Sequence, residues 1–139
     1  MRGTSSIQRN APIYVAGHRG LVGSAIVRKL TSRGYTNLIC RTHSELDLID
    51  AVATAAFFER EKPEYVFLAA AKVGGIMANM TYPADFIYQN LVLQSNVIHA
   101  AYRARVRKLL FLASSSIYSR HAPQPFYEGH FLDVPLERS

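Results

Sequence analysis

The sequence predicts an α/β fold, a doubly wound parallel sheet with helices on both of its faces. Short apolar runs of strand length alternate along the chain with longer amphipathic runs of helical length. At the first strand-to-helix junction three glycines, Gly17, Gly20 and Gly23, are spaced three residues apart. Alternation of this kind is typical of parallel strands that are joined by right-handed helical crossovers.

The glycine junction predicts a turn that binds a dinucleotide. Gly17 allows a tight turn, Gly20 lets the main chain approach a pyrophosphate, and Gly23 lets the following helix pack on the strand. The first N–H groups of that helix and its positive dipole end would face the phosphates. The spacing is G-x-x-G-x-x-G and not the commoner G-x-G-x-x-G, and the chain has no G-x-x-x-x-G-K-[ST] loop of a nucleotide triphosphatase.

The later elements follow from the same patterns. Asp50 is a suitable N-cap for a helix, Pro83 can occupy the first turn of another, and Lys72 to Ile76 form a glycine-containing loop. The expected strands are 13–16, 37–41, 65–71 and 108–113, and the expected helices begin near 21, 51 and 83, the last ending near 103.

Right-handed crossovers predict a partial Rossmann-type sheet with strand order 3-2-1-4. The first and fourth strands would then flank the crevice where ligands of such sheets bind. The continuous apolar strand 65–71 would be covered on both faces. This order would bring the glycine turn beside Ser114, Ser115 and Ser116, which end the fourth strand.

The helix 83–103 carries two apolar stripes. One is expected to face the sheet, and the other to contact another helix, either in this chain or in a second subunit. The first stripe is Phe86, Asn90, Leu93, Val97 and Ala101, and the second is Tyr88, Leu91, Val92, Ser95 and Ile98.

Composition narrows the function classes. The net charge is +6, but the basic residues are dispersed apart from a cluster at 103–108, which suits a solvated helix end, so we expect no nucleic acid partner. No apolar run approaches the roughly 18 residues that span a bilayer, so no membrane association is expected. Cys40 is the only cysteine, which excludes an intrachain disulfide and suits a reducing, cytoplasmic location. The five histidines have no metal-binding spacing, so we assign no metal.

Three regions are expected: a flexible leader at 1–10, a dinucleotide-binding domain at 11–118, and an irregular C-terminal tail at 119–139. The end of the second strand indicates the cofactor. Folds that prefer NAD place an acidic residue there for the ribose 2′-hydroxyl, whereas this chain has Arg41, Thr42 and His43, with no carboxylate before Glu45. A cation suits a 2′-phosphate, so NADP is favoured over NAD, with an exposed strand-end arginine as the alternative.

Several motifs then resemble a known family. The chain is similar to the GDP-L-fucose synthase family, the NADP-dependent epimerase/reductases of the extended short-chain dehydrogenase/reductase group. The resemblance spans roughly residues 12–125, and two of its motifs, 69–76 and 82–90, are highly specific. The motifs are AGHRGLVGSA at 16–25, RT at 41–42, AAAKVGGI at 69–76, YPADFIYQN at 82–90 and KLLFL at 108–112.

The resemblance implies a fold, an activity and roles for residues. Such enzymes epimerise GDP-4-keto-6-deoxy-D-mannose and reduce it with NADPH to GDP-L-fucose, and they pair through the helix at 83–103 and the one after it. Gly17, His18, Arg19, Gly20, Leu21, Val22 and Gly23 would hold the pyrophosphate, and Arg41 and His43 would lie near the ribose phosphate. Asp47 and Leu48 would lie beside adenine, Ala69, Ala70, Ala71, Leu112, Ala113 and Ser115 would complete the NADP(H) site, and Ser114 would be catalytic.

The chain departs from the family at three places. Ala113 replaces a glycine, and Ser116 stands where the family has an acid/base cysteine, whose thiol ionises far more readily than a hydroxyl. No tyrosine is followed four residues later by lysine, the pair that supplies the proton for reduction. We therefore expect the cofactor half of the enzyme without its substrate domain, inactive by itself. The alternative is a catalytically dead nucleotide-binding or interaction module.

Overall fold

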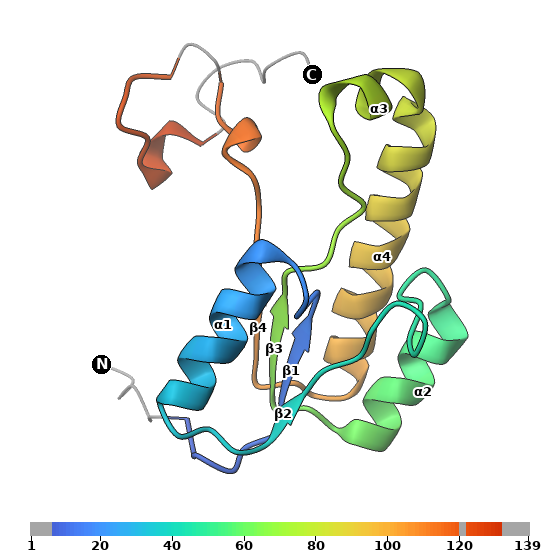
Figure 1. The fold of residues 1–139 in the computed structure, drawn as a ribbon, viewed down its shortest axis with the longest axis vertical. Coiled ribbons are helices and arrows are strands. Elements are labelled where there is room, and N and C mark those ends of the chain that lie inside the picture. The colour runs from blue at the N-terminus through green and yellow to red at the C-terminus, as the bar shows by residue number, and fades with distance from the viewer. Residues whose placement is uncertain (1–6, 120–121, 132–139) are drawn as a thin grey trace.

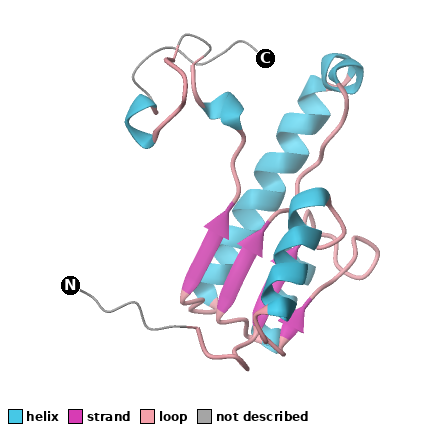
Figure 2. Cartoon of the chain, turned by 60° about the vertical axis from the view of Figure 1, so that its left-hand side comes forward, coloured by secondary structure: helices cyan, strands magenta, loops and turns pink. Residues whose placement is uncertain are grey.

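The computed structural model describes residues 7–119 and 122–131. Its centre is a parallel sheet of four strands with the order β2-β1-β3-β4. Figures 1 and 2 show helices on both faces of this sheet, which confirms the predicted α/β, Rossmann-type class. The strands are β1 (Ile13–Ala16), β2 (Leu38–Ile39), β3 (Tyr65–Leu68) and β4 (Lys108–Phe111).

The predicted strand order 3-2-1-4 is wrong. β3 pairs with β1 along its whole length, from Ile13 opposite Tyr65 to Ala16 opposite Leu68, and β4 pairs with β3. The reversal of strand order therefore lies between β1 and β3, not between the first and fourth strands. Burial explains the observed order, because the apolar β3 takes a central place and the two-residue β2 lies at the edge.

Four α-helices connect the strands. Two of them, α1 (Leu21–Ser32) and α4 (Pro83–Arg103), begin and end close to where the sequence predicts. The helix α2 (Ala51–Glu61) has the predicted cap, since Asp50 Oδ1 accepts hydrogen bonds from the N–H groups of Val52 and Ala53, both at 2.9 Å. The short helix α3 (Ile76–Thr81) begins at the last residue of the expected loop 72–76 and was not predicted.

The core lies between the sheet and the pair α2 and α4, which contact each other. Alternate strand residues face this layer, as the period of a strand requires. Three rings form its centre: the centroid of Tyr14 lies 4.7 Å from that of Phe57 and 5.9 Å from that of Phe58. The other buried members of the cluster are Ala16, Ile39, Leu46, Leu48, Val66, Leu68, Val97, Ala100 and Ala101.

Among the helices of the described residues, α1 alone covers the opposite face of the sheet, as Figure 1 shows. Tyr65 and Phe67 of β3 are only half-buried, and Leu110 and Phe111 of β4 are exposed. The expectation that the third strand is covered on both faces is therefore wrong for the described residues. One helix covers the β1 side of this face and does not extend over β4.

Only one stripe of α4 is packed within the described chain. Val97 and Ala101 of the first stripe are buried, whereas Tyr88, Leu91 and Ile98 of the second are 63%, 55% and 46% exposed. The second stripe was expected to contact either another helix of this chain or a second subunit. In the described part of the chain, no helix covers these three residues. A second subunit remains as the expectation.

The chain continues on either side of the sheet, before β1 and after β4. Residues 8–10 of the expected leader are joined to the domain, for example by the Thr36 N–H, which donates to the carbonyl of Arg9 at 3.0 Å. Residue 7 is described as well, and residues 1–6 of that leader lie outside the described residues. Among the residues described beyond β4, the chain forms two 3-10 turns, η1 (Ser115–Ile117) and η2 (Glu128–His130). No helix in the described ranges is long and apolar enough to cross a membrane.

Candidate functional site

A crevice of about 760 Å³ opens at the carboxyl ends of β1, β2 and β3. It is large enough for a cofactor or a sizeable small molecule, and it lies at the edge where ligands of parallel sheets bind. The segments that line it come from four regions of the sequence. They are Tyr14, 17–22, Arg41, Thr42, His43, 46–49, 69–73, Gln89 and Leu93.

The glycine turn has the geometry that its sequence predicts. Gly17 has a φ of +79°, in the left-handed region that favours glycine, and a Cβ there would lie 2.5 Å from the carbonyl oxygen of Ala69. A Cβ on Gly23 would overlap the carbonyl group of Gly17. Gly17 therefore allows the turn to pass close to β3, and Gly23 allows α1 to pack closely on the turn without itself lining the crevice.

The first turn of α1 is open to an anion. Gly20 is the N-cap, and it has no side chain that could accept a hydrogen bond from the first N–H groups of the helix. No acidic residue lies in the first turn. Leu21 and Val22, which line the crevice, are 90% and 51% exposed. Uncapped N–H groups and the positive end of the helix dipole therefore face the crevice, an arrangement that attracts phosphate.

A buried nitrogen lies in the same turn. The Nδ1 atom of His18 is buried and has no hydrogen-bond partner among the described residues. Buried polar atoms are normally paired, so an orphan beside an open crevice fits a group that arrives with the ligand.

Two arginines stand at the β2 side of the crevice. Arg19 is exposed, and Arg41 is half-buried with its guanidinium held from two directions. Arg41 Nη1 donates to its neighbour, the carbonyl of Cys40, at 2.8 Å, and Nη2 donates to Glu61 Oε1 at 2.9 Å. Its Cζ lies 5.7 Å from the centroid of the Phe57 ring. The end of β2 therefore presents fixed positive charge to the crevice.

The carboxylates beside these arginines have partners of their own. Glu45 Oε2 accepts from the backbone N–H and the hydroxyl of Thr42, both at 2.7 Å, and these bonds hold the pKa of the Glu45 carboxyl below its usual value. Asp47 Oδ1 lies 3.7 Å from His43 Nδ1. Glu45 thus closes the turn after β2 and is not among the residues that line the crevice.

The wall formed by residues 46–49 is tied to α4. The Asn96 amide donates to the carbonyl oxygens of Leu48 at 3.0 Å and Ile49 at 2.9 Å. Leu46 and Leu48 are buried against the core. An apolar wall held by a side chain from another helix is suited to a flat ring such as adenine.

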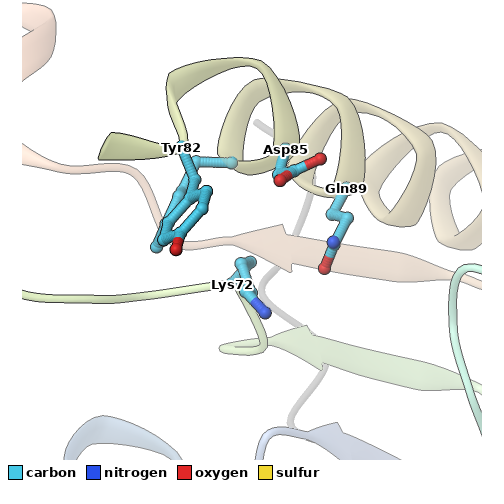
Figure 3. Close-up of a pocket in the computed structure, with 5 residues that line it drawn as sticks. Lys72, Tyr82, Asp85 and Gln89 are labelled. Atoms are coloured by element: carbon cyan, nitrogen blue, oxygen red, sulfur yellow. The ribbon is translucent and has the colours of Figure 1, made fainter. Parts of the chain in front are cut away.

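The opposite wall follows β3. Ala69, Ala70 and Ala71 line the crevice, as expected, and Lys72 continues it. Lys72 and Gln89 also line a smaller cavity of about 220 Å³ with Tyr82, Asp85 and Phe86, and Figure 3 shows the Lys72, Tyr82, Asp85 and Gln89 side chains around it. The two cavities therefore meet at Lys72 and Gln89.

The end of β4 is not part of the crevice. Leu112, Ala113, Ser114 and Ser115 do not line it, and Ser115 and Ser116 fall in η1. The expectation that the glycine turn and the serines share one crevice is wrong for this structure, because β3 separates β1 from β4. Ser114 is exposed and has an interaction within the structure.

Sequence reasoning missed several lining residues. The loop 72–76 was expected at the carboxyl end of the third strand, where ligands bind, but Lys72 and Val73 were not assigned to the site. Thr42 and Gln89 lie in the motifs 41–42 and 82–90 but were given no role in the site. Tyr14, Leu46, Ile49 and Leu93 lie outside the motifs, and they reach the crevice through the packing of the sheet and α4. No cluster of three or more His, Cys, Asp or Glu in the described ranges could hold a metal ion.

Comparison with known proteins identifies the family. The profile described as "NAD dependent epimerase/dehydratase family" matches residues 13–138. Two Arabidopsis thaliana proteins, a putative GDP-L-fucose synthase 2 and a GDP-L-fucose synthase 1, are 62% and 60% identical to the chain over 97% and 96% of it. The chain spans 41% and 42% of these relatives' own lengths.

A solved structure agrees in fold and sequence. It is MlghC, a GDP-mannoheptose C4 reductase from Campylobacter jejuni with NADP bound, at a TM-score of 0.88 and 45% identity, covering 95% of this chain and 42% of that one. Together with the glycine turn and the parallel sheet, these matches show that the chain belongs to the NAD dependent epimerase/dehydratase family.

Proposed function

We propose that the crevice binds NADP(H). The glycine cradle supports this, because a Cβ at Gly17 would overlap the backbone of Ala69 and one at Gly23 would overlap the carbonyl of Gly17, so the tight turn before α1 requires glycine at both positions. The open helix N-terminus and the orphaned His18 Nδ1 offer donors. Arg41, which lines the crevice, would meet the ribose 2′-phosphate, and the wall at Leu48 that Asn96 anchors would lie beside adenine. The observation that carries the proposal is the convergence of these groups on one crevice.

We further propose that the substrate is a GDP-linked keto sugar. The relatives of highest similarity described above are a GDP-L-fucose synthase and a putative one, which supports an epimerase/reductase that converts GDP-4-keto-6-deoxy-D-mannose to GDP-L-fucose. In that reaction the bound cofactor supplies a hydride to the sugar C4 carbon. Ser114 would donate a hydrogen bond to the 4-keto oxygen, and Ser116 would stand at the position of the epimerisation acid/base.

These 139 residues do not supply every group that this reaction needs. Reduction leaves an alkoxide that must be protonated, and a serine hydroxyl is too weak an acid near neutral pH. No tyrosine of the chain has a lysine four residues later to lower its pKa. We propose that these 139 residues bind the cofactor without turning over the sugar. The same observation favours the second candidate, a nucleotide-binding module without catalysis.

Calorimetric titration tests the binding step, and an assay of NADPH oxidation tests turnover. The chain is expected to bind NADPH more tightly than NADH, because an ion pair of Arg41 with the 2′-phosphate is worth on the order of 1 kcal/mol or more. With GDP-4-keto-6-deoxymannose, no oxidation above background is expected. Equal affinities for the two cofactors would overturn the NADP assignment. Turnover that disappears in Ser114→Ala would overturn the inactivity of the chain.

The second stripe of α4 supports self-association. Its positions Tyr88, Leu91, Ser95 and Ile98 are spaced alternately three and four residues apart, which is the seam spacing of paired helices. Tyr88, Leu91 and Ile98 are exposed in the single chain. We propose that two copies pair along this helix.

A further inference from the structure

Glu61 lies outside the crevice and holds the guanidinium of Arg41, which lines it. Its Oε1 accepts from Arg41 Nη2 at 2.9 Å, and it also accepts from Arg60 Nε at 3.2 Å and Arg60 Nη2 at 3.0 Å. The Glu61 side chain is 22% exposed and that of Arg41 is 32% exposed. Three donors from two arginines therefore converge on one half-buried carboxylate oxygen.

The position of Glu61 is unfavourable for its own helix. It is the last residue of α2, where the negative end of the helix dipole repels a carboxylate. The two arginines offset this repulsion, and their hydrogen bonds hold the pKa of Glu61 below its usual value, so it is ionised at neutral pH. A carboxylate at this place is therefore explained by its contacts with Arg41 and Arg60 and not by helix stability.

The contacts leave the guanidinium of Arg41 in one orientation. The Cys40 carbonyl takes one N–H group and Glu61 takes another, while the Phe57 ring lies near one face. A guanidinium has five N–H donors, so three remain after these two hydrogen bonds to described residues. Arg41 lines the crevice, whereas Glu61 and Arg60 do not. Glu61, which does not line the crevice, thus fixes the orientation of the positive charge that Arg41 presents to it.

We propose that Glu61 is a positioning residue for cofactor specificity, orienting Arg41 so that its remaining donors meet the ribose 2′-phosphate. The inference rests on the proposed binding of NADP(H). A long arginine side chain without such a partner must lose rotamer freedom when the phosphate arrives, which weakens binding. Arg60 balances the charge of Glu61, so the group of three keeps a net positive charge beside the phosphate.

The role predicts a specific pattern in calorimetric titrations of the 139-residue chain with NADPH and with NADH. Glu61→Ala is expected to weaken NADPH binding about five- to tenfold and to change NADH binding less than about twofold. Glu61→Gln keeps an oxygen that accepts from Arg41, so it is expected to bind NADPH within about twofold of the unchanged chain. Glu59→Ala, an exposed acidic residue of the same helix, is the matched control and is expected to bind as the unchanged chain does.

A double-mutant cycle separates positioning from a general structural effect. If Glu61 acts through Arg41, Glu61→Ala has no further effect on NADPH affinity in an Arg41→Ala background. Equal losses for NADPH and NADH, or additive effects of the two substitutions, would overturn the positioning role. Tighter NADPH binding by Glu61→Ala would overturn it too, by showing that Glu61 competes with the phosphate. Failure of the unchanged chain to bind NADPH would instead overturn the proposed function, so the two failures are distinguishable.

Discussion

The side-chain amide of Asn90 pairs with both backbone groups of Lys72. Asn90 Oδ1 accepts from the Lys72 N–H at 2.8 Å, and Asn90 Nδ2 donates to the Lys72 carbonyl at 3.0 Å. Nδ2 also donates to the Phe86 carbonyl within α4 at 2.9 Å. One side chain thus bonds both backbone groups of a residue in the loop after β3 and fastens the crevice wall to α4.

Replacing Asn90 should loosen this wall. Asn90→Leu removes both bonds to Lys72, and we expect a loss of about 1 kcal/mol in the free energy of unfolding, measured by urea denaturation. NADPH affinity should fall as well, because the loop after β3 lines the crevice. Asn79→Ala is the control, since Asn79 also bonds backbone carbonyls of this loop, at Gly74 and Gly75, but lies outside the crevice. Unchanged stability and affinity in Asn90→Leu would show that the pair does not hold the wall.

A methyl group at Gly17 should abolish cofactor binding. Gly17→Ala brings a Cβ to 2.5 Å from the Ala69 oxygen and strains a φ of +79°. The turn must move away from β3, so NADPH binding measured by calorimetry should fall at least about tenfold, with a lower Tm. In Gly75→Ala the new methyl group meets no atom within 4 Å, so this variant should retain binding. If both variants bind alike, the turn is not the phosphate cradle.

Patterns within single segments predicted most of the elements. Asp50 capped its helix, Pro83 began the longest one, and the three glycines formed the turn, because each feature depends on a few neighbouring residues. The arrangement of strands was not contained in such patterns. The apolar length of β3 indicated a central strand, and that observation should have overruled the generic order of such sheets.

The crevice was predictable only in part. Its glycine turn and Arg41 carried motifs, whereas its walls depend on contacts between distant residues. Asn96 bonds to Leu48, 48 residues before it, and Asn90 bonds to Lys72, 18 residues before it. The sequence placed Asn90 in the sheet-facing stripe and in the motif 82–90 but did not indicate its partner, and it gave Asn96 no role. An amide in a helix has many possible partners, and packing decides which of them it meets.

The pH dependence of Cys40 reactivity follows from its burial. Burial raises the pKa of the Cys40 thiol, and the nearby Arg41 offsets this in part. The thiolate is the reactive form, so alkylation by iodoacetamide at pH 8 should be slower in the folded chain than in guanidinium chloride. The midpoint of the rate against pH should also lie above that of the unfolded chain.

The same shift links to stability with a definite sign. A thiol with a raised folded pKa favours the folded state below its unfolded pKa of about 8.5, and this contribution is lost as pH rises through the folded value. The rate of Cys40 alkylation at each pH is measured by mass spectrometry of the alkylated protein over time, with Cys40→Ser as the unreactive control. A folded midpoint at or below the unfolded one would contradict the effect of burial.

Two copies of the chain are expected to pair along the second stripe of α4. Leu91 lies at the centre of the second stripe and is 55% exposed in the single chain, so pairing would bury it. A carboxylate at that seam would be desolvated beside its copy, which opposes pairing. Light scattering should give a mass that rises with concentration for the unchanged chain and stays that of a monomer for Leu91→Glu.

The control is a second exposed apolar residue that lies off the stripe. Val52→Glu makes the same change of charge at a residue that is 80% exposed on α2, in a first helical turn that favours an acid. It should associate as the unchanged chain does. A monomer at every concentration without any substitution would rule out pairing, and equal disruption by both substitutions would show that net charge, and not the α4 seam, governs association.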